Sequence, residues 1–509
     1  MADGRRRAGG RAARVALREA PLEEDARAIR PGMSGGRFRP LDDRAVAEVI
    51  DAAFGLLEEL GMGQATPEFV EVVTAAGGTY DGTRLRFPRD LVRSMIEIAC
   101  KEFTLYGWDD SKNVHIGGDR VHFATSGAAV MMLDHGTRRF RHSQLQDIYD
   151  CARVADTLDN IHIFVRTVVP RDLELARDID INTAYAVMVG TSKPIGTSMF
   201  QPDHVHDVVT MFDMALGGEG EFRKRPFAIA NNTFVVPPLR FAEDSALAMA
   251  EQARLGMPIN LLSAGQAGAT SPAALAGSLT QALAECLAAL TCVNLISPGH
   301  PCTMGLWPFV SDLRTGAMSG GSGEEAIINA AAAQVVNDLG LPSGVAAGMC
   351  DSKLPDNQAG HEKANAITLA ANAGSNVVFE AAGMLASLMA CSLEALVIDN
   401  DMLGSIMRTV RGIEVDASSL STDVIREVIA GPGHYLGHDQ TLSLMQSEYI
   451  YPEVGSRLSP DDWVDAGAKS VDEVAHERVE RILAEHRPSH VDPVRDAEIR
   501  ARFDIRLHR

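Results

Sequence analysis

The densest group of side chains that could do chemistry follows a short apolar run at residues 344–350. From there the chain passes through Asp351, Lys353, Asp356 and Gln358 before a helical pattern begins. Carboxylates and an ammonium group at the end of a buried strand could bind or polarise a charged substrate, as loops of α/β proteins do. An ordinary polar loop between a strand and a helix would have a similar composition, so this stretch alone leaves both interpretations open.

Eight apolar, strand-like runs alternate with helical patterns, and they begin at Val121, Ile161, Pro194, Phe227, Pro258, Pro301, Gly344 and Asn376. Two of the intervening helices end in the same Leu-Gly-x-Pro sequence, at residues 255–258 and 339–342, where glycine predicts a left-handed C-cap. Ser322 and Glu325 predict a capping box at the start of another helix. Eight such units predict an α/β protein with a (β/α)8 TIM barrel, and a doubly wound open sheet is the competing topology.

In a parallel barrel the functional side chains lie at the C-terminal ends of the strands. These ends add guanidinium, amide, aromatic and carboxylate groups, namely Arg166, Phe200, Asn231, Gln266, Trp307, Phe309 and Glu380. Carboxylates beside aromatic rings suit a quaternary ammonium group, which donates no hydrogen bonds and is held by cation–π and electrostatic attraction. Each aromatic residue could equally belong to the core.

Several other kinds of site lack their sequence signatures. The chain contains no G-x-S-x-G, no G-x-x-x-x-G-K-[ST] and no recognisable Ser-His-Asp order. His204 and His206 lie two residues apart near a helix start, where both are expected to face solvent. No spacing of ligands predicts a metal site.

Composition and charge narrow the choice of partner and compartment. The 509-residue chain has a net charge of −21, which argues against nucleic acid or an anionic membrane as a partner. Its seven cysteines show no C-x-x-C spacing, so a reducing cytoplasm is expected. The longest apolar passage, residues 273–296, is interrupted by Gln281, Glu285 and Asn294 and predicts a buried helix rather than a membrane span.

The chain is expected to divide into four parts. Residues 1–40 predict a flexible basic arm, 41–120 an N-terminal α-rich cap, 121–411 the barrel, and 412–509 a C-terminal helical extension. The arm could instead clamp a neighbouring subunit. A large acidic barrel with such additions predicts a symmetric homo-oligomer.

Four motifs together give the chain a family resemblance: residues 271–278 (SPAALAGS), 348–362 (GMCDSKLPDNQAGHE), 381–385 (AAGML) and 431–436 (GPGHYL) followed by QTL at 440–442. Over about residues 40–480 they resemble the trimethylamine methyltransferase family. The resemblance implies a (β/α)8 barrel that passes a methyl group from a methylated amine to the Co(I) centre of a separate small corrinoid protein. Because the cobalamin-binding signature D-x-H-x-x-G is absent, the corrinoid is expected on that partner.

One departure from the family bears on the substrate. Its archaeal trimethylamine enzymes carry pyrrolysine in the barrel, at or near the 344–362 stretch, whereas every residue here is a standard one. Without that electrophile a neutral tertiary amine is a poor methyl donor, because the departing anion would be very basic. A quaternary amine releases a neutral tertiary amine instead, so the resemblance implies a glycine-betaine-type member of this methanogenesis-related family.

This hypothesis gives the strand-end residues roles. Asp351, Lys353 and Glu380 are the candidate catalytic residues, with the carboxylates supplying a negative field, and Arg166 or Lys353 would pair with a substrate carboxylate. The other candidates for substrate binding are Phe200, Asn231, Gln266, Trp307, Phe309, Asp356, Gln358 and His434. Two alternatives stay open: a non-catalytic barrel that binds quaternary amines, and a cobalt-independent enzyme acting on another methylated amine.

Overall fold

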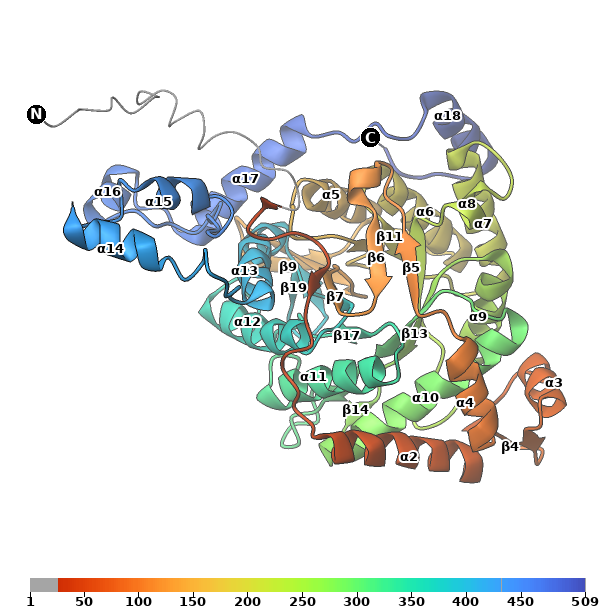
Figure 1. Ribbon diagram of the computed structural model, residues 1–509. Helices are drawn as coiled ribbons and strands as arrows, with labels where there is room; N and C mark the ends of the chain where they lie inside the picture. The colour runs from red at the N-terminus through yellow and green to blue at the C-terminus, as the bar shows by residue number, and fades with distance from the viewer. Residues whose placement is uncertain (1–25, 432, 509) are drawn as a thin grey trace, which may run out of the picture.

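The computed structural model describes residues 26–431 and 433–508 (Figure 1). Its centre is made of eight parallel strands, each of which overlaps one of the eight apolar runs. They are β7 (Arg120–Phe123), β10 (Phe164–Val165), β11 (Ile195–Thr197), β12 (Ala228–Thr233), β13 (Ile259–Ser263), β15 (Cys302–Leu306), β17 (Gly344–Ala346) and β18 (Val377–Phe379).

The central strands pair in two parallel groups. β10, β11, β12, β13 and β15 pair in that order, and β7, β18 and β17 pair in theirs. Single parallel bridges, Ala124 with Ile163 and Met304 with Ser343, join the two groups at both of their edges. The protein is therefore an α/β structure in which strands that follow one another in sequence are also neighbours in space.

A helix follows each central strand, and these helices surround the strands (Figure 1). They are α5 (Leu145–Asp156), α6 (Ala176–Gly190), α7 (Pro202–Leu216), α9 (Glu243–Leu255), α10 (Leu275–Ile296), α11 (Gly323–Asp338), α12 (Asn357–Asn372) and α13 (Leu393–Arg411). Gly256 and Gly340 adopt φ of 78° and 65°, which confirms the left-handed ends predicted for α9 and α11. The capping box is only half present: Ser322 accepts from the Glu325 amide, whereas the buried Glu325 carboxyl has no hydrogen-bond partner.

Two small sheets are built from the segments that follow the central strands. β8 (Met131–Asp134) and β9 (Arg139–His142) form a hairpin that pairs with β20 (Ala390–Cys391) and β19 (Met384–Leu385). β14 (Gln266–Ala267) pairs with β16 (Phe309–Val310). These pairings fix the loops that surround the C-terminal ends of the central strands.

Before β7 the chain forms a helical layer with short strands. α2 (Asp43–Glu59) and α4 (Arg89–Ile98) pack on α10, and α3 (Pro67–Ala75) lies beside them. The short strands are β2 (Met62–Gly63), β3 (Thr79–Tyr80), β4 (Arg84–Arg86), β5 (Glu102–Leu105) and β6 (Val114–Gly117).

The predicted flexible arm falls partly outside the described residues, since residues 1–25 are not described. The rest of it differs from the prediction. β1 (Met33–Ser34) pairs antiparallel with β7, and the amide of Phe38 donates to the carbonyl of Asn372 (3.0 Å). Because these backbone hydrogen bonds tie the segment to β7 and to the end of α12, residues 33–38 form part of the body.

The C-terminal part consists of short helices that follow α13. α14 (Thr422–Ala430), α15 (Asp439–Leu444) and α16 (Pro460–Asp465) project from one side of the body, drawn in blue in Figure 1. α17 (Val471–Glu485) returns to pack on α13 and α5, and α18 (Pro493–Arg502) packs on α7.

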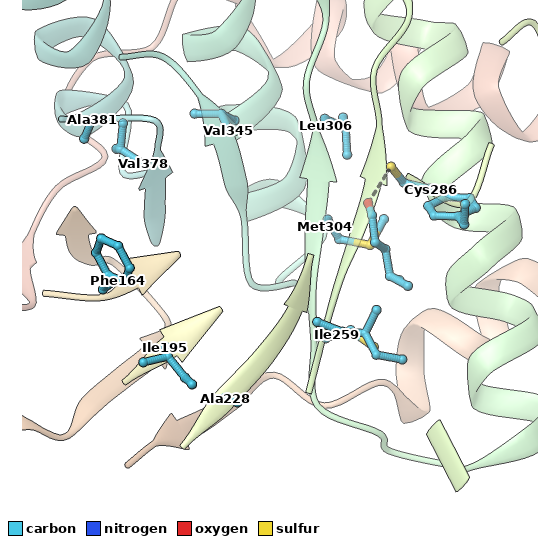
Figure 2. Packing of buried hydrophobic residues seen from close by; sticks show 14 of the residues in the cluster. Phe164, Ile195, Ala228, Ile259, Cys286, Met304, Leu306, Val345, Val378 and Ala381 are labelled. Atoms are coloured by element: carbon cyan, nitrogen blue, oxygen red, sulfur yellow. Dashed lines mark hydrogen bonds between the residues drawn. The ribbon is translucent and has the colours of Figure 1, made fainter. Parts of the chain in front are cut away.

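The core lies inside the strands and between them and the helices. Figure 2 shows Phe164, Ile195, Ala228, Ile259 and Met304 packed together from successive strands, all of them buried. Among the described residues one helix, α10, is long and apolar enough to cross a membrane, but 83% of its most apolar window is buried inside the protein. Burial on all sides explains its apolar composition, as the sequence predicted for residues 273–296.

Candidate active site

A cavity of about 330 Å³ opens at the C-terminal ends of the central strands. Every central strand except β17 contributes lining residues just at or beyond its end, among them Ser126, Arg166, Phe200, Asn231, Trp307 and Glu380. Its position matches the face at which parallel barrels carry their chemistry.

Two other cavities are larger but less suited to chemistry. One, of about 580 Å³, is lined by Asp159 and His162, which precede β10 and so lie at the N-terminal ends of the strands. The other, of about 460 Å³, is lined by a loop in which Asp312 and Arg314 pair with each other at 2.8 Å. The 330 Å³ cavity is therefore the candidate active site.

Arg166 brings a positive charge to this cavity without an ion-pair partner among the described residues. Its Nε and Nη2 donate to Ser198 Oγ (3.2 and 3.1 Å), and its Nη1 donates to the Gly127 carbonyl (3.1 Å). Burial lowers the pKa of Arg166 to about 10, while the nearby Asp180 carboxyl opposes that shift. Since a guanidinium has five N–H donors, Arg166 retains donors for a ligand carboxylate.

Glu380 brings a buried carboxyl group that can take the opposite charge when it ionises. It follows β18 directly, and its buried Oε2 atom has no hydrogen-bond partner in the part of the chain that the structure describes. Burial raises the pKa of Glu380 to about 8. Its backbone is left-handed (φ 61°), which is uncommon for a residue other than glycine and marks a position held by its surroundings. A cation in the cavity would supply the missing partner.

Aromatic rings line another part of the cavity. Trp307 and Phe309 follow β15, with ring centroids 6.3 Å apart, and Phe379 packs behind Trp307 at 5.5 Å. Phe200 also borders the cavity and is 44% exposed. Trp307 and Phe309 are buried apart from the surface they present to the cavity, so they belong to the core and also line the cavity.

A chain of side-chain hydrogen bonds crosses the strands at the base of the site. Asn231 Nδ2 donates to Ser126 Oγ (3.0 Å), Asn260 Nδ2 donates to Asn231 Oδ1 (2.7 Å), and Thr303 Oγ1 donates to Asn260 Oδ1 (2.8 Å). These bonds run from β12 to the segment after β7 and to β13 and β15. They hold Asn231 in one orientation and so give the cavity a rigid polar base.

A buried histidine–aspartate pair behind Arg166 was missed in the sequence. His204 was expected to face solvent, but it is buried and its Nδ1 lies 2.5 Å from Asp180 Oδ2. The same Asp180 oxygen accepts from the Phe200 amide (2.7 Å). The prediction for His204 was wrong because the exposure of this side chain depends on which face of α7 packs on α6. His206, two residues further along, is exposed as expected.

A second buried carboxyl, Glu325, was also missed. Burial raises the pKa of Glu325 well above its ordinary value, and the charges of Glu380 and Asp351 act in the same direction. Both of its carboxyl oxygens are buried, and neither has a hydrogen-bond partner among the described residues. The S-x-x-E spacing predicted that the Glu325 side chain caps the helix. No signal in the neighbouring sequence distinguishes a capping carboxylate from a buried carboxyl.

Asp351, predicted to act on the substrate, holds loops together instead. Its Oδ1 accepts from the Gly320 amide (2.8 Å) and from Ser387 Oγ (2.5 Å), and its Oδ2 accepts from Ser319 Oγ (3.2 Å). Ser387 lies in a run of three left-handed residues, Ala386–Leu388 (φ 53°, 51° and 71°), that ends at Leu388 on the cavity wall. Asp351 therefore shapes the wall without lining the cavity.

The other polar residues after β17 also lie outside the cavity. Lys353 is exposed and donates to the Asp351 carbonyl (2.6 Å), and Gln358 is exposed and donates to Glu362 (2.8 Å). Asp356 is the N-cap of α12 and accepts from the Ala359 amide (3.1 Å). The ordinary alternative for this stretch was a polar loop between a strand and a helix, and Asp356 has a structural role of that kind at the start of α12.

Gln266 and His434 are likewise not among the residues that line the cavity. Gln266 lies in β14, and its main chain accepts hydrogen bonds from a turn that ends at Ser271. His434 is exposed in the projecting C-terminal part. Six of the twelve candidates therefore meet at one cavity: Arg166, Phe200, Asn231, Trp307, Phe309 and Glu380.

Comparison with known proteins identifies the family. The family described as trimethylamine methyltransferase (MTTB) matches residues 7–508. The chain belongs to the trimethylamine methyltransferase family. It is 33% identical to the trimethylamine methyltransferase MttB of Methanosarcina thermophila over 80% of this chain and 84% of that one. It is 30% identical to the glycine betaine methyltransferase of Desulfitobacterium hafniense strain Y51, over 91% and 96% of the two chains. The protein is a methyltransferase.

Solved structures agree with the fold. The monomethylamine methyltransferase MtmB of Methanosarcina barkeri matches with a TM-score of 0.52 and 12% identity, over 92% of both chains. An MtmB complex with hydroxylamine gives a TM-score of 0.53 and 13% identity over the same shares. This likeness supports the α/β architecture of the chain.

Proposed function

We propose that this chain takes a methyl group from a betaine-like quaternary amine and passes it to the Co(I) corrinoid of a partner protein. One observation carries the choice of substrate: the cavity holds a buried carboxyl, Glu380, and a guanidinium, Arg166, and within residues 26–431 and 433–508 neither forms an ion pair. A small zwitterion with a quaternary ammonium and a carboxylate complements both. The relative named glycine betaine methyltransferase, which matches nearly end to end, supports this substrate class.

The aromatic residues would complete the cation site. A quaternary ammonium group presents only methyl groups, so it binds by cation–π and electrostatic attraction rather than by hydrogen bonds. Trp307 and Phe309 supply ring faces on the cavity wall, and Glu380 supplies the counter-charge. Arg166 would bind the substrate carboxylate by charge-assisted hydrogen bonds, for which a guanidinium is well shaped.

The proposed methyl transfer requires no general acid or base among these residues. One C–N bond breaks, its electron pair stays on nitrogen, and a neutral tertiary amine leaves without needing a proton. The corrinoid, when present, supplies the nucleophile that receives the methyl group. The chain's residues would hold the N-methyl carbon at the cavity mouth and exclude water, which are contributions of position and environment.

The size of the cavity bears on where the corrinoid sits. About 330 Å³ is at the small end of ligand pockets and suits a small amine rather than a corrinoid macrocycle. We therefore assign substrate binding to this chain and cofactor binding to a separate small corrinoid protein that docks at the mouth. No residue of the cavity is assigned to cobalt.

The remaining expectations are proposals of the same kind. The eight strands would form a closed (β/α)8 barrel, supported by the bridges that join both edges of the two strand groups. Residues 41–120 would be the cap, 121–411 the barrel and 412–509 the helical extension. A cytoplasmic location is supported by seven free cysteines, six of them buried. A homo-oligomer is expected for a protein of this kind.

A substrate panel tests the proposal. The purified full chain is mixed with Co(I) cobalamin and either glycine betaine, choline or trimethylamine, and methylation of cobalt is followed by absorbance. Glycine betaine should react, choline should react more weakly because it lacks the carboxylate, and trimethylamine should not react. Consumption of trimethylamine with no reaction of betaines would refute the proposal. Binding of betaine without methyl transfer, even with corrinoid protein added, would favour the non-catalytic alternative.

A further inference from the structure

Three elements far apart in the sequence bring metal-binding side chains together away from the cavity. His135 lies in the turn between β8 and β9, Glu394 in the first turn of α13, and His476 on α17. One ligand atom from each of the three lies within 4.8 Å of the others. None of them lines the 330 Å³ cavity, so this cluster has no part in the proposed methyl transfer.

Existing contacts within the cluster already join each histidine to a carboxylate. His476 Nδ1 lies 2.9 Å from Glu394 Oε1, and His135 Nε2 lies 3.2 Å from Asp472 Oδ2. The two imidazole rings stack at 3.9 Å between centroids with an interplanar angle of 11°. Four side chains with suitable donor atoms are thus gathered from three separate segments.

Two details indicate that the cluster is built to hold a further group. Asp472 Oδ1 is buried and finds no hydrogen-bond partner within the described ranges, although the other oxygen of this carboxylate faces His135. Glu394 is nearly buried, and its Oε2 accepts from Ser392 Oγ (2.9 Å), which fixes the carboxylate as outer-shell partners fix metal ligands. A cavity of about 210 Å³, lined by His135, Glu394 and Asp472, leads to these atoms.

We propose that His135, Glu394, Asp472 and His476 bind one divalent transition-metal ion, with Zn²⁺ as the occupant. Imidazole nitrogens and carboxylate oxygens are its usual ligands in proteins, at about 2.0–2.2 Å in a tetrahedral arrangement. Ligand atoms in such a site lie about 3.4 Å apart. Two pairs lie 2.9 and 3.2 Å apart here, the ligand atoms of His135, Glu394 and His476 lie within 4.8 Å of one another, and Asp472 reaches the group through its contact with His135. Because the two rings are stacked nearly parallel, binding one ion would require one imidazole to rotate about its Cβ–Cγ bond so that its nitrogen points toward the ion.

This proposal departs from the expectation, based on ligand spacing, that the chain holds no metal. Asp472 and His476 are four residues apart on one face of α17, but His135 and Glu394 come from distant segments, so no local motif exists. Four protein ligands leave no open position, as in structural zinc sites. The ion would therefore fasten α17 to α13 and to the β8–β9 hairpin.

Zinc titration of the full-length protein tests the site. After treatment with a chelator, the protein should bind about one Zn²⁺ per chain in calorimetry, and Co²⁺ in its place should give the intense visible absorption of a tetrahedral site. His476→Ala and His135→Ala should each weaken Zn²⁺ binding more than about 100-fold, beyond the loss that outer-shell changes cause. The matched control is His206→Ala, which removes an exposed histidine paired with Glu251 on α9. This variant should bind Zn²⁺ as tightly as the unaltered protein does.

Two outcomes would overturn the proposal: no Zn²⁺ binding tighter than the high-micromolar range, or tight binding that both histidine variants retain. Circular dichroism of the variants keeps the result interpretable, since a folded variant that has lost Zn²⁺ binding supports the site. A variant that does not fold is replaced by Asp472→Asn, which keeps the shape of the side chain. Added Zn²⁺ should raise the melting temperature of the unaltered protein and leave that of Asp472→Asn unchanged.

Discussion

Replacing Glu380 by glutamine should abolish the pH dependence of substrate binding. Glu380 is the only acidic residue among the described residues that line the cavity, and burial raises its pKa to about 8. At pH 7 about nine tenths of the free protein would then carry the protonated acid. A bound quaternary cation favours the ionised carboxylate, so binding must release a proton, and affinity should rise with pH until about pH 8.

The size of the effect follows from the ionised fraction. This fraction is about one half at pH 8 and about one hundredth at pH 6, so the Kd for glycine betaine should weaken about 50-fold between them. At pH 7, binding should release about 0.9 proton. Calorimetry in phosphate and in Tris, buffers with different ionisation enthalpies, measures both quantities. Glu380→Gln should bind weakly at every pH, with a flat profile.

Two matched variants make the test specific. Glu243→Gln removes an exposed carboxylate on α9 and should keep the full pH profile. Glu325→Gln removes the neighbouring buried carboxyl and should leave a proton release close to one at pH 7. Equal affinity at pH 6 and pH 8, or an unchanged profile in Glu380→Gln, would refute the reasoning. If the pH dependence of binding were lost in Glu325→Gln and kept in Glu380→Gln, the titrating carboxyl would be Glu325 and not Glu380.

Four further outcomes are expected. Arg166→Met should raise the KM for glycine betaine about 10- to 100-fold, the usual worth of a charge-assisted hydrogen bond, and change the KM for choline little; steady-state kinetics compares them. Trp307→Leu should weaken binding of both amines about 10-fold by loss of a cation–π contact, measured by calorimetry on protein shown to be folded. Glu380→Gln should stabilise the free protein by on the order of 3 kcal/mol at pH 7 and by little at pH 4.5. A buried acid whose pKa is raised on folding lowers the stability of the protein as the pH rises from the unfolded pKa to the folded pKa, and glutamine does not ionise. Urea unfolding at both pH values measures the difference. Lys363→Met should cost about 3–5 kcal/mol in the same assay, since it leaves the buried Asp399 carboxylate, now 2.6 Å from the Lys363 ammonium, without its partner.

The architecture could be predicted because its signals are local. Each central strand is a short apolar run, and the ends of α9 and α11 are set by Gly256 and Gly340, whose left-handed backbone follows from the residue type. The strand ends in turn predicted that Arg166 and Glu380 lie near the cavity, since a residue directly after a parallel strand lies at the face where the C-terminal ends of the strands meet. These inferences need only the order of residues along the chain.

The parts that failed depend on partners distant in sequence. Asp351 looked like a catalytic carboxylate until its hydrogen bonds to residues 319–320 and to Ser387 showed that loops from two other strands use it. His204 and Glu325 were misjudged because burial depends on which face of a helix packs inward. α11 carries apolar residues on several faces, so the sequence did not single out one. α7 does have one apolar face, and the spacing of His204 from Val208 and Met211 places it on that face, which is the signal that was overlooked.

The left-handed backbone at Glu380 has a consequence for how this protein can change. Glycine adopts a left-handed backbone without steric cost. A glycine at position 380 would therefore relieve backbone strain of about 1–2 kcal/mol and would also remove a buried acid. Selection for thermal stability alone would therefore drive position 380 toward glycine and discard the counter-charge of the cavity. Laboratory evolution of this protein for heat tolerance should find that substitution early, and the clones that carry it should be the ones that have lost affinity for cations.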